Sequence, residues 1–167
     1  IVVMSGSGTS GRVAFLIARN LNEVLEEAGK RPCFRYLCSG GDAALLLSDE
    51  LPEDDTISAV KDLLVISAEQ GQNDEVMVIG ITCGMSAPYV AGQIDFVLDA
   101  CDGCLKGEYD KPNLPRYTAV LLGFNPVEMA RPALIEMWSE RPEAQSKTML
   151  DVARRLERAA MRQRSEE

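Results

Sequence analysis

The chain has 167 residues, of which 46% are hydrophobic and 26% are charged, a balance typical of one folded domain with a sizeable core. Its net charge of −9 argues against nucleic acid or an anionic membrane surface as a partner, and no apolar run approaches the roughly 20 residues that a membrane span needs. The sequence has no histidine, which excludes Ser-His-Asp and Cys-His catalysis and histidine-ligated metals from this segment.

Strand-like and helix-like segments alternate along the chain. The predicted elements are, in order, a strand over 1–5, a helix over 10–28, a strand over 33–38, a short helical or irregular piece over 43–47, an acidic loop over 48–55, a helix to about residue 68, a strand over 75–82, a helix from residue 86, an irregular surface insertion over 101–116, a strand over 117–123 and a helical tail from residue 125. The first helix carries an apolar face made of Val13, Ile17, Leu21, Val24 and Ala28.

This alternation predicts an α/β fold with a parallel sheet between layers of helices. Ligands in such folds bind beyond the carboxyl ends of the strands. The turns expected there read "SGSGTSGR", "CSGGD", "TCGMSAP" and "GFNP". Because all four are rich in glycine, serine, threonine or asparagine, we expect them to form one polar pocket.

The first of these turns resembles a nucleotide-binding loop but departs from it. Its glycines match the G-x-G-x-x-G spacing, yet the second strand is followed by no acidic residue before Asp42, and the Gly-Lys-Ser/Thr of a P-loop is absent. The remaining interpretations are a tight turn with capping hydroxyls or a helix N-terminus at which Thr9 and Ser10 donate to phosphate oxygens. A second hydroxyl turn, Thr82 to Ser86, favours phosphate.

The five cysteines form no disulfide framework and indicate a reducing compartment, with the cytoplasm expected and the nucleus as the alternative. Cys101 and Cys104 form a lone C-x-x-C, which lacks the second pair that a zinc site needs. No metal or other cofactor is predicted. The arginines between residues 154 and 164 are expected to form a solvated helix face.

Longer motifs carry a resemblance to a known family. "GSGTSGR", "SGGD", "PEDD", "VIGITCGMSAPYVAGQ" and "GFNPVEMARPALIEMW" resemble the sugar isomerase (SIS) family of phosphosugar-binding domains. This family includes the glucokinase regulatory proteins and the bacterial N-acetylmuramic acid 6-phosphate etherases. The last two motifs are similar to the regulator branch and not to the etherase branch.

The resemblance implies a three-layer α/β/α sandwich around a parallel sheet of about five strands. It implies a non-catalytic regulatory domain that binds fructose 6-phosphate or fructose 1-phosphate and acts on a glucokinase or hexokinase-type partner through domains outside this chain. The ligand-binding residues that it implies are Gly8, Thr9, Ser10, Glu53, Thr82, Cys83, Gly84 and Ser86. No catalytic residue is predicted.

An etherase remains the main alternative, and the carboxylates that its reaction needs distinguish it from a non-catalytic regulatory domain. The resemblance implies that etherases of this family use two glutamates as base and acid, one in the helix after "GTSGR" and one in the acidic loop. Two carboxylates are needed because the reaction takes a proton from carbon and gives another to the leaving oxygen. This chain has Glu53 in the acidic loop but Asn20 in the helix, and an amide cannot exchange that proton. A ligand-free structural module of a larger enzyme is the third hypothesis.

Two segments are expected. Residues 1–138 form the SIS-type domain, which lacks the family's last strand, and residues 139–167 form a helical tail. Because the chain opens on Ile1 within a strand, we expect it to be a fragment of a longer protein without a signal peptide.

Overall fold

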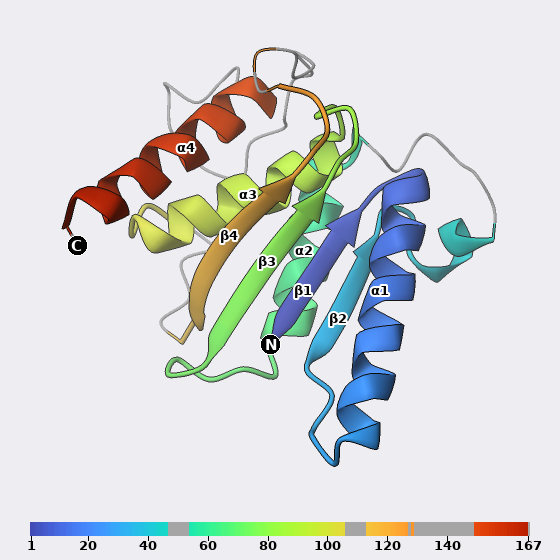
Figure 1. Cartoon of the computed structure of the whole chain (residues 1–167). Helices are drawn as coiled ribbons and strands as arrows, with labels where there is room; N and C mark the ends of the chain where they lie inside the picture. Colours follow the sequence, from blue (N-terminus) through green and yellow to red (C-terminus); the bar gives the residue numbers. More distant parts are fainter. Residues whose placement is uncertain (47–53, 106–112, 127, 129–148, 167) are drawn as a thin grey trace.

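The structure is a computed structural model that describes residues 1–46, 54–105, 113–126, 128 and 149–166 (Figure 1). Its elements are β1 (Val2–Gly6), α1 (Gly8–Glu27), β2 (Phe34–Cys38), a 3-10 helix η1 (Asp42–Leu45), α2 (Thr56–Ser67), β3 (Glu75–Ile81), α3 (Pro88–Cys101), β4 (Arg116–Leu122) and α4 (Met149–Glu166). None of the helices within these residues is long and apolar enough to cross a membrane.

The four described strands form one parallel sheet in the order β2-β1-β3-β4, which confirms the predicted α/β fold. The central strand β1 pairs with β2 and β3, so that Gly6 lies between Cys38 and Ile81. Because every strand runs in the same direction, all four carboxyl ends lie at one edge. The resemblance implies about five strands, and the described residues form four of them.

Helices α2 and α3 cover one face of the sheet, behind the strands in Figure 1. The core on this side joins Val3 of β1 and Val78 of β3 to Leu63 of α2 and to Ile94 and Phe96 of α3. Nearly every residue of α3 is buried, because it packs against the sheet, α2 and α4.

Helix α1 covers the other face over β1 and β2 (Figure 1). Its buried residues are Gly11, Ala14 and Ala18, whose small side chains let the helix approach the strands closely. The apolar face predicted from Val13, Ile17, Leu21 and Val24 is therefore not the face that packs on the sheet, since these four side chains are 37 to 60% exposed.

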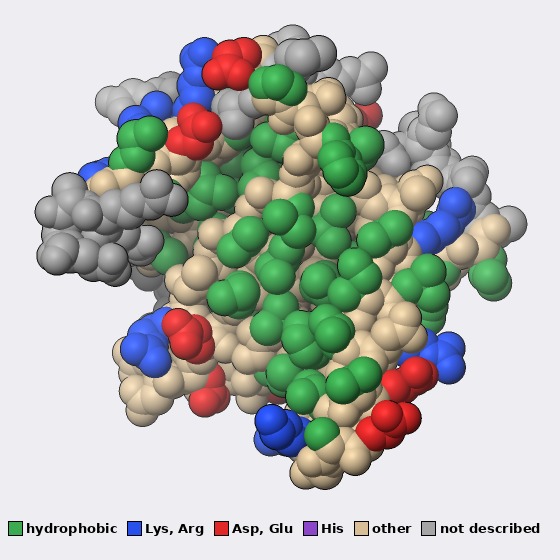
Figure 2. Space-filling model, viewed as in Figure 1, with side chains coloured by type: hydrophobic (Ala, Val, Ile, Leu, Met, Phe, Trp, Pro, Cys, Tyr) green, Lys and Arg blue, Asp and Glu red, His purple; other side chains and the backbone are tan. Residues whose placement is uncertain are grey.

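No described helix covers the half of this face over β3 and β4, which we call the open half. Figure 2 shows hydrophobic side chains gathered there beside α1, and they include Met77, Leu122 and Phe124. Parallel sheets are normally covered on both faces. The open half is thus an apolar surface next to the carboxyl edge.

Helix α4 packs on α3 and β4. Arg155 is 15% exposed and its guanidinium lies 2.6 to 2.9 Å from the carboxylates of Asp95, Asp99 and Asp102. Burial alone would lower the pKa of Arg155, but hydrogen bonds to Asp102 and Asp99 and their charge raise it above its ordinary value. The prediction of a solvated basic face is therefore wrong for Arg155.

Several predicted boundaries shift. Phe124 to Pro126 form no helix, and most of the remaining residues before α4 lie outside the described ranges, as does most of the acidic loop over 48–55. Asp55 does begin α2 as expected: its Oδ1 accepts a hydrogen bond of 2.8 Å from the backbone N–H of Ser58.

Candidate functional site

The four polar turns meet at the carboxyl edge of the sheet. The backbone N–H of Ser39 donates to the carbonyl of Gly6 at 3.1 Å, which joins the second turn to the first. The N–H of Phe124 donates to the carbonyl of Cys83 at 3.1 Å, and the Asn125 side-chain amide donates to the carbonyl of Gly84 at 3.3 Å. The expected convergence of sequence-distant turns is thus present.

Close backbone packing sets the first turn. A Cβ on Gly6 would lie 2.6 Å from the backbone nitrogen of Gly11, so the start of α1 sits directly on the end of β1. Gly8 has a φ of +52°, a conformation that glycine adopts without strain. Thr9 and Ser10 follow in the first turn of α1, beside the N–H groups that a helix N-terminus leaves without an intrahelical acceptor.

The turn between β3 and α3 is fixed by its own hydroxyl. Thr82 is buried, and its Oγ1 accepts a hydrogen bond of 3.2 Å from the backbone N–H of Ser86. Met85 has a φ of +52°, an uncommon conformation for a residue other than glycine, and its side chain is buried. Cys83 is exposed at the surface of this turn.

A hollow of about 690 Å³ lies between α1 and the open half of the sheet, within the range of ligand pockets. Its end at the carboxyl edge is formed by Thr9, Ser10 and Cys83, and the rest of its lining is apolar or glycine: Val13, Ile17, Ile81, Leu122, Gly123 and Phe124. None of the described lining residues is charged. The single polar pocket expected from all four turns is not formed, because most of this lining is apolar and the turn after β2 contributes no residue to it. A phosphate at this edge would be held by helix ends, N–H groups and hydroxyls.

Seven of the eight predicted ligand-binding residues lie in two turns at the carboxyl edge, and the eighth is not described. Gly8, Thr9 and Ser10 lie at the start of α1, and Thr82, Cys83, Gly84 and Ser86 lie in the turn after β3, both at the same edge. Glu53 lies outside the described residues. Their role in ligand binding stays a prediction.

Asn20, which the family resemblance places where etherases have a glutamate, lies elsewhere. It is ten residues beyond Ser10 on α1, which corresponds to about 15 Å along the helix axis. Its side chain is exposed. Within this domain, Asn20 is therefore remote from the polar turns.

Arg12 and Tyr36 position the turn after β2, a role that sequence reasoning did not assign. Arg12 donates from Nε to the carbonyl of Leu45 at 3.2 Å and from Nη2 to that of Ala44 at 3.3 Å. Tyr36 Oη donates to Asp42 Oδ1 at 2.7 Å, and this hydrogen bond, with burial, raises the pKa of Tyr36 to about 12. Both side chains hold η1 against the start of α1 and the end of β2.

Two buried serines at this edge were also missed. Ser7 and Ser39 directly follow β1 and β2, and within the part of the chain that the structure describes their hydroxyls have no hydrogen-bond partner. The only sequence signal is that both stand in the polar turns "SGSG" and "CSGG".

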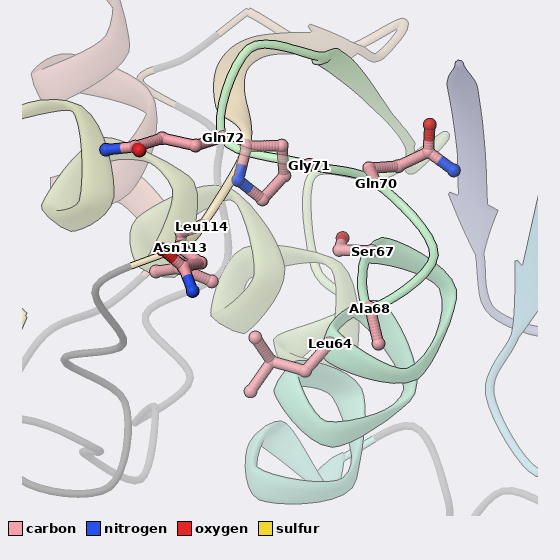
Figure 3. Close-up of a pocket in the computed structure, with 9 residues that line it drawn as sticks. Leu64, Ser67, Ala68, Gln70, Gly71, Gln72, Asn113 and Leu114 are labelled. Carbon is pink, nitrogen blue, oxygen red and sulfur yellow. The ribbon is translucent and has the colours of Figure 1, made fainter.

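A second hollow, of about 530 Å³, lies at the opposite edge of the sheet (Figure 3). Leu64 and Ser67 of α2 and Leu114 from the segment before β4 line it, whereas the side chains of Gln70 and Gln72 extend to opposite sides, away from the centre. It contains none of the predicted ligand-binding residues.

Comparison with known proteins identifies the family of the chain. The model of the glucokinase regulatory protein N-terminal SIS domain matches residues 1–98. The chain is 40% identical to mouse (Mus musculus) glucokinase regulatory protein over 138 residues, which is 83% of this chain and 20% of the relative. It is 36% identical to the human (Homo sapiens) protein over 165 residues, which is 99% of this chain and 23% of the relative.

A more distant relative is N-acetylmuramic acid 6-phosphate etherase 2 of Bacillus licheniformis, 36% identical over 95 residues, which is 57% of this chain and 30% of that protein. The chain spans about a fifth of the length of the regulatory proteins that it matches. Since the regulator model matches more than half of the chain, the chain belongs to the family of glucokinase regulatory protein N-terminal SIS domains.

Proposed function

We propose that this domain binds a phosphosugar at the carboxyl edge of its sheet and serves as the sensing part of a regulatory protein. The observation that carries the proposal is the meeting of the α1 N-terminus and the turn before α3 at one edge, with hydroxyls of Thr9, Ser10, Thr82 and Ser86. Helix N-termini attract anions through their free N–H groups and dipole. A phosphate is the anion that such a set of donors suits best.

The ligand that we propose is fructose 6-phosphate or fructose 1-phosphate, with Glu53 as a further contact. Only the end of the hollow at the carboxyl edge is polar. We therefore expect contacts at that end and none along the apolar remainder. The partner would be a glucokinase or hexokinase-type enzyme, contacted by parts of a longer protein.

We further propose that the domain does not catalyse a reaction. Elimination of lactate from a muramic sugar needs an acid and a base. Position 20 supplies an amide instead of a carboxylate, and it lies about 15 Å along α1 from Ser10. The matches to etherases keep that activity as the second candidate. Release of lactate from N-acetylmuramic acid 6-phosphate would support it.

The test measures the melting temperature and the heat of binding with fructose 6-phosphate and fructose 1-phosphate, with fructose and inorganic phosphate as controls. A ligand that binds only the folded state at 100 times its Kd stabilises by about 2.7 kcal/mol, so we expect a clear rise. Ser10→Ala and Thr82→Ala should abolish it. Thr118→Ala, an exposed threonine of β4, should not.

Absence of binding by any phosphosugar, or binding that is the same in all three variants, would refute the proposed site. Equal binding of fructose and fructose 6-phosphate would refute the role given to the phosphate.

A further inference from the structure

Three hydroxyl residues form a row across the carboxyl edge. Ser39, Ser7 and Thr82 directly follow Cys38, Gly6 and Ile81, which are paired across β2, β1 and β3. The ladder continues one step beyond these pairs, because the N–H of Ser39 donates to the carbonyl of Gly6. Neighbouring strands lie about 4.8 Å apart, so the row extends over about 10 Å.

Ser7, the central member of the row, faces a defined side of the sheet. Side chains alternate along a strand, and Ser7 keeps an extended conformation with φ of −115° and ψ of 149°. It therefore shares the face of Ser5, which pairs with Gly80. A Cβ on Gly80 would meet Val90 and Ile94 of α3, so this is the face that α2 and α3 cover.

Two members of the row are buried without a partner. Ser39 is 2% and Ser7 is 8% exposed, and neither hydroxyl makes a hydrogen bond to any described part of the chain. Ser7 is the N-cap of α1 but makes no side-chain cap. A buried hydroxyl without a hydrogen bond is unfavourable, so both groups are suited to a ligand.

We infer that Ser7 and Ser39 bind the hydroxyl groups of the sugar, while the start of α1 and the Thr82 turn bind the phosphate. This assignment rests on the proposed function and goes beyond it by giving the ligand a direction, with the phosphate near β3 and the sugar extended toward β2. Hydroxyl side chains both donate and accept, which matches a polyol. The buried row thus makes the site selective for a sugar phosphate over phosphate alone.

The experiment compares Ser39→Ala and Ser7→Ala with the wild-type chain by calorimetric titration of fructose 6-phosphate and, separately, of inorganic phosphate. Loss of one neutral hydrogen bond should weaken fructose 6-phosphate binding about three- to tenfold and leave the affinity for inorganic phosphate unchanged. The melting temperature of the free variants should equal or exceed that of the wild type, because no internal hydrogen bond is lost.

Ser67→Ala is the matched control, since Ser67 is also 2% exposed but lies at the opposite edge (Figure 3). It should bind both ligands like the wild type. Unchanged fructose 6-phosphate binding in Ser39→Ala and Ser7→Ala, with binding lost in Thr82→Ala, would overturn this inference and leave the proposed function standing. If Ser39→Ala and Ser7→Ala weaken the binding of inorganic phosphate as much as that of fructose 6-phosphate, the proposed orientation of the ligand is wrong. Failure of the wild type to bind either sugar phosphate would overturn both proposals.

Discussion

Replacement of Arg155 by methionine should destabilise the contact between α4 and α3 strongly. The guanidinium lies 2.9 Å from Asp95, 2.6 Å from Asp99 and 2.6 Å from Asp102. The side chains of Asp95 and Asp99 are 1% and 0% exposed, whereas Asp102 is 51% exposed. Methionine keeps the apolar packing but removes the guanidinium from beside two buried carboxylates.

Removing one partner of a buried ion pair costs about 3 to 5 kcal/mol. Asp102 adds little, because an exposed pair contributes at most about 1 kcal/mol. The loss is large beside the total stability of a domain, about 5 to 15 kcal/mol. We expect Arg155→Met to lower the free energy of unfolding in urea by about 3 kcal/mol or more, while Arg154→Met, an exposed neighbour on α4, changes it by less than about 0.5 kcal/mol.

A second substitution tests whether the lost charge interaction with the buried carboxylates causes this destabilisation. Asp99→Asn should destabilise the wild type, because it weakens a buried charged pair, but should stabilise the Arg155→Met variant, because it removes one of the two buried charges that lose the guanidinium. Hydrogen exchange along α4 and β1 would separate local release of α4 from global unfolding. A loss below about 1 kcal/mol for Arg155→Met, or destabilisation by Asp99→Asn in both backgrounds, would refute the reasoning.

Three further predictions concern the fold around the site. Gly6→Ala should cost about 1 to 3 kcal/mol, because its Cβ would overlap backbone atoms of α1; Gly71→Ala, with only an ordinary contact at 3.5 Å, is the control in the same urea titration. Asp55→Ala should lower the free energy of unfolding by about 1 kcal/mol, because the α2 N-cap is lost. The hydrogen bond to Ser58 lowers the pKa of Asp55, so this difference in unfolding free energy should be complete above about pH 4 and become smaller as the pH falls. Tyr36→Phe should lower the free energy of unfolding below about pH 10. This difference should disappear as the pH rises toward 12, because the pKa of Tyr36 in the folded protein is raised to about 12. A difference in unfolding free energy that stays constant between about pH 8 and about pH 12 would contradict this.

The order of the elements could be predicted from the sequence because the apolar pattern alternates between the strand and helix periods. The convergence of the four turns followed from the parallel sheet alone. The boundaries were less accurate where backbone conformation decides them: α1 begins at Gly8, two residues before the predicted start at Ser10, and α3 begins at Pro88 because Met85 occupies the left-handed region.

The packing partners could not be predicted. The periodicity of α1 identifies an apolar face but not whether it contacts the sheet, and the small residues Gly11, Ala14 and Ala18 carry that contact. The spacing of arginines in α4 cannot show that Arg155 meets three carboxylates of another helix. The missing partners of Ser7 and Ser39 are likewise a property of tertiary structure.

The absence of charged side chains from the described lining of the hollow has a consequence for how binding responds to pH. Hydroxyls, backbone N–H groups and helix dipoles gain and lose no proton near neutrality, so these groups present the same fixed dipoles across that range. With the proposed ligand, the charge that changes would be that of its phosphate, which takes its second negative charge near pH 6. Affinity at this edge would then follow the dianion fraction of the phosphosugar, and the sensor would report the amount and ionisation of its ligand instead of its own protonation state.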